Sequence, residues 1–325
     1  MKTFIRVVEV WLPVADGSLL EFGGGLYDHA RGFGAISRHM VFGRGEGLPG
    51  RAWESGRPIM LKRLADSYFL RARAAAAEGL TCAIALPQFD RDKLKSVLLI
   101  FCGDDATHAG AIELWHNEPA RSPDMTLAEG YYGGAAEIFA FMSRHTSFRK
   151  GFGLPGMAWQ SGLPVFLPDL GKGSRFLRAD SAMKVGINRG LAIPCSTSSR
   201  NTSSSPRSAT GSDSFVMAFL SALDTSIARR IETWLPDPDY RYLLLESGFC
   251  EAQGELGRTS LAERVERGEG ALGRALASGV PVISEVASNE PGPAGAAAHA
   301  AKLASLVALP LWRGDRVVAV VAWYF

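Results

Sequence analysis

Three glycine-rich segments have the spacing of a loop that binds dinucleotide phosphates. Gly45–Gly50, Gly151–Gly156 and Gly268–Gly273 all read G-x-G-x-x-G, a pattern in which backbone N–H groups hold a pyrophosphate at a helix N-terminus. That chemistry needs a helix long enough to cross back to a parallel strand. Here Ser55–Pro58 and its two counterparts end the helix almost at once, because proline disfavours further helix. The segments are therefore predicted to be tight turns before short helices.

Cysteine and histidine residues show no catalytic spacing either. The four cysteines form no C-x-x-C pair, and the six histidines form neither H-x-x-x-H nor H-E-x-x-H. Cysteines in or beside apolar runs are typical of buried thiols in a reducing compartment, and this holds for Cys82, Cys102, Cys195 and Cys250. We predict no catalytic residue, no metal-ligand set and no enzyme activity, and the sequence identifies no cofactor.

Two histidines recur at matching places. His39 and His145 each end a Ser-Arg-His sequence. We interpret them as helix-terminal residues that bind carbonyl groups and suit the helix dipole. The alternative is that they form the rim of an anion-binding pocket.

The elements around each glycine-rich segment repeat as well. The segments start at residues 45, 151 and 268, a period of roughly 110 residues, which is the size of a small domain. We therefore divide the chain into module one (residues 1–108), module two (109–226) and a more diverged module three (227–325). Each is expected to hold strands, a helix, the glycine-rich turn, a second helix and a closing β-hairpin.

A glutamate precedes a tryptophan in the first expected strand of every module. The three pairs are Glu9–Trp11, Glu113–Trp115 and Glu232–Trp234, with one residue between the two members. We interpret the glutamates as structural, pairing across strands or with an arginine at a module interface.

Modules one and two share the phrase G-x-G-L-P-G-x-x-W-x-S-G-x-P, followed by a short strand, a helix and a strand such as Ala85–Pro87. This phrase resembles the GAF domain of bacterial sensor proteins. Arg71 after Phe69, and Arg178 after Phe176, lie where such sequences have an F-x-R segment. The resemblance is weaker in module three.

The resemblance implies an α+β fold of three tandem GAF-like modules. Each would have a central antiparallel sheet of about six strands with short helices and a ligand pocket on one face. Members that reduce methionine sulfoxide carry a cysteine within the glycine-rich motif. Leu48, Leu154 and Ala271 occupy those places here, which makes a thiol-dependent reductase the least favoured reading.

Aromatic residues of the sheet and helices are the candidate walls of such a pocket. The candidate pocket residues are Trp11, Phe22, His39, Phe42, Trp53 and Phe69 in module one, and Trp115, His145, Phe148, Trp159 and Phe176 in module two. The same side chains would also fill an ordinary core, so a filled pocket remains the alternative.

The joins between modules are too short for the long flanking helices that tandem GAF modules usually have. One face of each sheet would then lack its cover, and an apolar sheet face must be buried against something. We expect the modules to pack on one another in one compact unit, with pseudo-threefold symmetry.

Charge and composition limit the classes of partner that the chain is expected to bind. A net charge of +2 without basic runs gives no case for nucleic acid, and no apolar run is long enough to span a membrane. With no signal peptide, the expected location is cytoplasmic. The serine-rich segment 196–214 is interpreted as a solvated insertion, with a phosphorylation or docking loop as the alternative.

Function follows from the resemblance. The first hypothesis is a cytosolic signalling or regulatory sensor that binds a small molecule, a protein partner or both, with its output in trans. The alternative is a scaffold or oligomerisation protein with filled pockets. A homo-oligomer is compatible with either.

Overall fold

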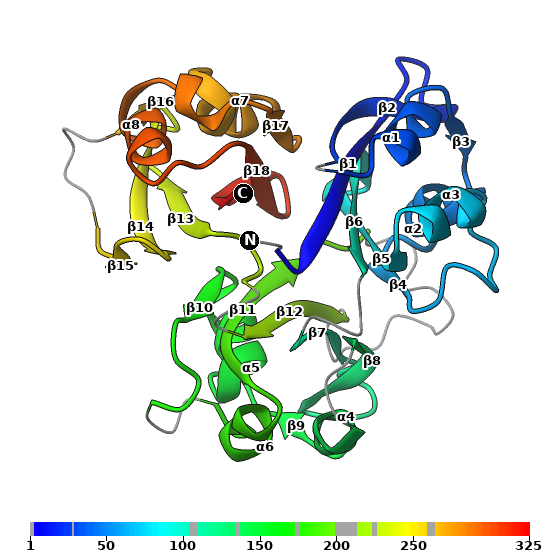
Figure 1. Cartoon of the computed structure of the whole chain (residues 1–325), viewed down its shortest axis with the longest axis vertical. Coiled ribbons are helices and arrows are strands. Elements are labelled where there is room, and N and C mark those ends of the chain that lie inside the picture. Colours follow the sequence, from blue (N-terminus) through cyan, green and yellow to red (C-terminus); the bar gives the residue numbers. More distant parts are fainter. Residues whose placement is uncertain are drawn as a thin grey trace.

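Three antiparallel sheets, one from each module, are arranged around a common centre. The computed structural model describes residues 3–27, 29–103, 109–133, 137–172, 176–198, 213–222, 226–258 and 264–325. Figure 1 shows three lobes, with the first strand starting and the last strand ending close to the centre. Most of the serine-rich segment, residues 199–212, lies outside the described residues.

The first sheet has the strand order β3-β2-β1-β6-β5-β4. Its strands are β1 (Ile5–Pro13), β2 (Leu19–Leu26), β3 (Val41–Gly43), β4 (Ile59–Leu61), β5 (Leu80–Asp90) and β6 (Lys93–Gly103). Its helices are α1 (Arg31–Ser37), α2 (Gly47–Ser55) and α3 (Ala72–Ala77).

The second sheet repeats this topology, because its order β10-β11-β12-β7-β8-β9 is the same path read from the other edge. Its strands are β7 (Ala109–Asn117), β8 (Met125–Gly133), β9 (Ser147–Phe148), β10 (Val165–Leu167), β11 (Ile187–Cys195) and β12 (Ser214–Ala222). Its helices are α4 (Glu137–Arg144), α5 (Gly153–Ser161) and α6 (Ala179–Lys184).

The third sheet adds one strand to the same plan. Its order is β15-β14-β13-β19-β18-β17, and β16 also pairs with β14 at the place that β3 takes in module one. Its elements are β13 (Arg230–Pro236), β14 (Tyr242–Cys250), β15 (Gly254–Leu256), β16 (Val265–Glu266), α7 (Gly270–Ser278), β17 (Val282–Ser284), a 3-10 turn (Ala287–Asn289), α8 (Gly292–Ala300), β18 (Leu306–Arg313) and β19 (Arg316–Tyr324). The α+β fold of three repeated modules is thus confirmed.

The glycine-rich segment is a tight turn that presses a short helix onto a strand. The amide of Gly45 donates to the carbonyl of Gly50 at 2.9 Å, and α2 ends at Gly56 in the left-handed conformation, with φ of 62°. A Cβ atom at Gly50 would lie 2.0 Å from the carbonyl oxygen of Gly43. The matching glycines of modules two and three, Gly156 and Gly273, would place a Cβ atom 2.3 and 2.1 Å from a backbone carbonyl oxygen. The third glycine therefore serves helix–strand packing and not a phosphate group.

Alternate side chains of each sheet enter two different cores. In β6, Val97, Leu99 and Phe101 face the helices of their own module. Leu98 and Ile100 belong to a core that all three modules share. The uncovered sheet faces therefore pack on one another at the centre, as the short joins predict.

Contacts around the centre join each module to the next. Thr81 of module one lies 2.8 Å from the hydroxyl of Tyr131 in module two, and the guanidinium of Arg189 lies 4.4 Å from the ring centroid of Phe249 in module three. β17 of module three packs against β2 of module one, which closes the ring. The arrangement is a head-to-tail ring of the kind cyclic trimers form, here within one chain.

The described start of the serine-rich segment also lies on module one. The Ser198 amide donates to the carbonyl of Gly56 at 3.0 Å, and the Ser196 hydroxyl donates to that of Pro87 at 3.1 Å. None of the described helices is long and apolar enough to cross a bilayer.

Candidate functional site

The interior of module one is occupied by a buried ion pair. Arg71, at the N-terminus of α3, donates from Nη1 and Nη2 to the two carboxylate oxygens of Glu9 on β1, at 2.6 and 2.9 Å. The side chains are 2% and 0% exposed. Nη1 also donates to the hydroxyl of Ser37 on α1. This fork-to-fork geometry is the strongest form of a carboxylate–guanidinium contact.

The remaining acceptor capacity of Glu9 is used as well. The indole Nε1 of Trp11 and the hydroxyl of Tyr27 each donate to it at 3.1 Å. Burial, and then the charge of Glu9, raise the pKa of the Tyr27 hydroxyl far above its usual value, so it stays a donor. A fully bonded network of this kind can keep two charges in a dry interior.

Aromatic rings surround the guanidinium of Arg71. Its central carbon lies 4.4 Å from the ring centroid of Phe33 and between 5.2 and 5.7 Å from those of Phe69, Phe101 and Trp11. Such cages bind cationic ligands in other contexts. Here the arginine of the chain itself is the occupant.

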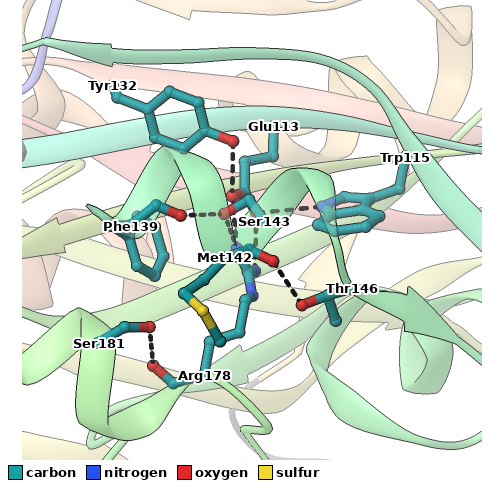
Figure 2. A network of polar contacts seen from close by, with 9 residues as sticks. All are labelled: Glu113, Trp115, Tyr132, Phe139, Met142, Ser143, Thr146, Arg178 and Ser181. Atoms are coloured by element: carbon teal, nitrogen blue, oxygen red, sulfur yellow. Dashed lines mark hydrogen bonds and ion pairs between the residues drawn. The ribbon is translucent and has the colours of Figure 1, made fainter. Parts of the chain in front are cut away.

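Module two, whose network Figure 2 shows, repeats the bonds of module one almost atom for atom. Arg178 donates to the two carboxylate oxygens of Glu113 at 2.6 and 2.8 Å, and also to the hydroxyl of Ser143. Trp115 and Tyr132 donate to the same carboxylate at 3.1 and 3.2 Å. The Arg178 carbon lies between 4.9 and 5.7 Å from the ring centroids of Trp115, Phe139, Phe148 and Phe176.

Module three keeps the ion pair but draws the arginine from another element. Arg230 Nε donates to Glu232 at 2.6 Å, and both residues lie on β13. Trp234 and Tyr324 donate to the other oxygen of Glu232 at 2.8 and 2.9 Å. The carboxylate of Glu232 therefore accepts from an arginine, a tryptophan and a tyrosine, as that of Glu9 does, but the arginine and the tyrosine come from other strands or helices.

The strand registers show which positions have been exchanged. Arg230, two residues before Glu232, takes the place of Val7 in module one. Ala294 takes the place of Arg71, because each lies the same number of residues before the last residue of its helix, α8 in module three and α3 in module one. Cys250 pairs with Arg230, at the position that Tyr27 holds in module one. The smaller side chain leaves room for the strand arginine.

Six of the eleven predicted pocket residues lie around these arginines or pack directly on a ring that does. They are Trp11, Phe42, Phe69, Trp115, Phe148 and Phe176, all buried. The Trp11 and Phe42 rings meet edge to face at 4.6 Å, and Trp115 and Phe148 do the same at 4.6 Å. The predicted walls thus surround an arginine side chain.

The other five lie farther out. Phe22 packs edge to face on Trp11 at 5.7 Å, and Trp53 and Trp159 are half-buried on α2 and α5. His39 and His145 are exposed after α1 and α4, and His145 Nδ1 lies 2.8 Å from the carbonyl oxygen of Phe141.

One interpretation of the glutamates needs correction. Glu9 and Glu113 bind arginines inside their own modules and not at a module interface. The F-x-R arginines were visible in the sequence, yet nothing in their spacing links them to strands some sixty residues away. The repeated Glu-x-Trp and F-x-R pairs, considered together, were the available signal.

The described residues also show how the possible metal ligands and the thiols are placed. Among the described residues, no group of three His, Cys, Asp or Glu side chains could hold a metal ion. Burial raises the pKa of the Cys195 thiol to about 12, so it is protonated at neutral pH and a poor nucleophile. Cys82, Cys102 and Cys250 are fully buried.

Comparison with known proteins gives one family match. Residues 218–325 match the family model described as GAF domain. Among curated protein sequences, none matches the chain.

Several solved structures are similar to part of the chain. The A. aeolicus nlh2 GAF domain in an inactive state is 18% identical, with a TM-score of 0.25, over 30% of this chain and 58% of that one. The GAF domain region of a putative membrane protein from Geobacter sulfurreducens is 15% identical, with a TM-score of 0.26, over 30% and 64%. Free methionine-R-sulfoxide reductase from Neisseria meningitidis is 22% identical, with a TM-score of 0.22, over 30% and 52%. The chain therefore spans less than two thirds of each of these neighbours.

Proposed function

The chain is built of three GAF-like modules, and from this premise we propose that it is a signalling or regulatory protein whose module interiors hold no ligand. The three modules form a closed platform that acts on a protein partner in trans. This is the scaffold reading, with a regulatory role retained from the family.

The filled interiors are the observation that carries the proposal. Where a GAF ligand pocket would lie between sheet and helices, Arg71 and Arg178 each occupy an aromatic cage and bind a buried glutamate. A ligand would have to displace an arginine that makes three charge-assisted hydrogen bonds, each worth about 1.5–3 kcal/mol.

Module three supports the same conclusion independently. Its pair uses Arg230 on the strand in place of a helix arginine, yet the glutamate beside the tryptophan is again neutralised. An interior that serves as a ligand pocket in one module would not need the same internal counter-ion in all three.

No catalytic step is assigned. The candidate thiols are buried or held protonated, and a nucleophile must be accessible and ionised to react.

Denaturation and refolding of the full chain test the proposal. Guanidinium chloride strips any non-covalent ligand, and dialysis then returns the chain to buffer alone. We expect the refolded and the untreated protein to have the same melting temperature and the same slow hydrogen exchange in β1, β7 and β13. A refolded protein that exchanges fast in these strands until a cell extract of small molecules is restored would overturn it.

A further inference from the structure

A cavity of about 620 Å³ lies where module one meets module three. Module one contributes residues in or directly beside β1, β2 and α1. Module three contributes Arg229 just before β13, Glu285 just after β17, the two residues before β18 and the last residue, Phe325. This volume is within the range of small-molecule sites in proteins. It lies outside the filled interiors, on the edge of the shared core.

At the other two junctions, the described residues place an aromatic ring at the equivalent position. In module one, Leu26 of β2 pairs with Val8 of β1, and its neighbour Gly25 pairs with Glu9. The same register assigns Tyr131 to this place in module two and Phe249 in module three. Tyr131 packs on Phe4 with ring centroids 6.5 Å apart, and Phe249 packs on Phe166 at 5.7 Å. Leu26 is the smaller residue, and the cavity lies beside it.

The lining of the cavity is rich in positive charge. Among the described residues, the lining includes four arginines, Arg6, Arg31, Arg38 and Arg229, and one acidic residue, Glu285. Arg6 and Arg229 stand at the same strand position of modules one and three, three residues before Glu9 and Glu232. Module two has Gly110 at that place, where a Cβ atom would lie 2.6 Å from the Phe4 ring. Two modules thus direct an arginine to one junction.

Neighbouring groups hold part of this arginine set in place. Arg229 Nη1 donates to the carbonyl of Lys302 at 3.0 Å, and its Nε lies 3.8 Å from the Glu251 carboxylate. Arg38 lies over the ring of Tyr27, 5.5 Å from its centroid. Arg31, the first residue of α1, and Arg38, which follows its last residue, are exposed and line the cavity.

Apolar groups form much of the remaining lining, which also includes Thr3 and Ser305. Ile5, Val8, Leu26, Ala304 and Phe325 line the cavity together with the Tyr27 ring. A ligand that fits such a site needs an apolar body and an anionic group for the arginines.

We propose that this junction binds a small organic anion, with a carboxylate or phosphate group at the arginines and an apolar body against Leu26 and Phe325. The site goes beyond the proposed platform, because it gives the platform a signal to respond to. Tyr27 is shared between the cavity and the network in module one, since its hydroxyl donates to Glu9 at 3.1 Å. A ligand in the cavity would therefore contact Tyr27, which also bonds to the buried pair of Arg71 and Glu9.

Calorimetric titration of the full chain tests the proposal. The probes are hexyl phosphate and hexanoate, which distinguish the two anionic groups, with 1-hexanol and inorganic phosphate as single-feature controls. The double variant Arg31→Gln/Arg38→Gln removes charge at the mouth. Arg144→Gln is the matched control, because Arg144 occupies the Arg38 position of module two and does not line the cavity. Leu26→Phe copies the aromatic residue that module three has at this position, Phe249.

We expect at least one of the two amphipathic anions to bind more tightly than either control probe. The dissociation constant should rise about tenfold or more in Arg31→Gln/Arg38→Gln, equivalent to about 1.4 kcal/mol. Binding should be lost in Leu26→Phe and unchanged in Arg144→Gln.

Three results would overturn the proposal. They are no heat with either anion, equal binding of 1-hexanol, or binding that survives the arginine double variant. If Leu26→Phe lowers the melting temperature by more than a few degrees, the arginine double variant alone decides, since both of its residues are exposed.

Discussion

Removing the buried arginine of module one should destabilise the whole chain far more than its position in a short helix suggests. Arg71→Ala leaves the Glu9 carboxylate buried at 0% exposure without its counter-ion. Breaking one member of a buried pair costs about 3–5 kcal/mol. Arg73→Ala is the matched control, because Arg73 lies on the same helix but is exposed, and it should change the free energy of unfolding by less than about 0.5 kcal/mol.

The cost of protonating the Glu9 carboxylate in Arg71→Ala gives a loss of similar size. A glutamate with an ordinary pKa of about 4.3 needs about 3.7 kcal/mol to take up a proton at pH 7, from 2.7 pH units at 1.36 kcal/mol each. Protonation is the cheapest relief for an orphaned carboxylate, so it sets the scale of the loss. The loss should therefore be smaller at pH 5 than at pH 7 by up to about 2.7 kcal/mol.

Module three supplies a design for rescue. Adding Val7→Arg and Tyr27→Cys to Arg71→Ala copies the arrangement of Arg230, Cys250 and Ala294. We expect this triple variant to regain about half of the loss, or roughly 2 kcal/mol, because the new arginine meets the same carboxylate in a less adapted site.

Urea unfolding followed by tryptophan fluorescence measures these free energies, since Trp11 lies within the network. A loss below about 1 kcal/mol for Arg71→Ala, or a loss equal at pH 5 and pH 7, would refute the reasoning that the arginine neutralises a buried charge.

Three further predictions concern packing and pH. Gly50→Ala should lower the free energy of unfolding by about 3 kcal/mol or prevent folding, since its Cβ atom would lie 2.0 Å from a carbonyl oxygen. Gly257→Ala is the control, because a Cβ atom there has nothing within 4 Å. Thermal unfolding compares the two variants, and equal melting temperatures would contradict the close packing at Gly50. Burial raises the pKa of Tyr27 and Tyr324 above 10, so the unfolded chain loses these protons first and stability should fall as pH rises above 10, by about 1.4 kcal/mol per pH unit and tyrosine. Either tyrosine changed to phenylalanine should flatten that slope, and an unchanged slope would count against it. Phe219→Ala should lower the free energy of unfolding by about 3–5 kcal/mol, because Phe219 packs on Trp323 across the shared core at 5.6 Å. All three modules should still unfold in one thermal transition, and separate transitions in calorimetry would mean that the modules unfold independently.

The fold was largely predictable because its signals are local. Glycine-rich turns, alternating apolar residues and the helix stop at Pro58 are dictated by backbone sterics and burial within a few residues. The absence of flanking helices also predicted that the sheets would cover one another. These arguments need no knowledge of the partner residues.

The site was predictable only in part. The aromatic residues that gather in each interior follow from strand and helix periodicity. The partner of Glu9 does not, because Arg71 meets it through tertiary packing. A bulge between Val10 and Trp11 also shifts the register with β2, so counting alternate residues does not reveal that Leu26, Tyr131 and Phe249 are equivalent. The junction cavity depends on that equivalence.

The occupancy of the module interiors by arginine can be measured directly by ¹⁵N NMR of the guanidinium groups in the full chain. We expect slowly exchanging signals from Arg71, Arg178 and Arg230, the first two shifted by the aromatic rings around them. The signal of each should vanish in its own alanine variant while the others remain. Guanidinium protons that all exchange rapidly with water, or that are released when a small molecule enters, would contradict the claim that the modules work with closed interiors.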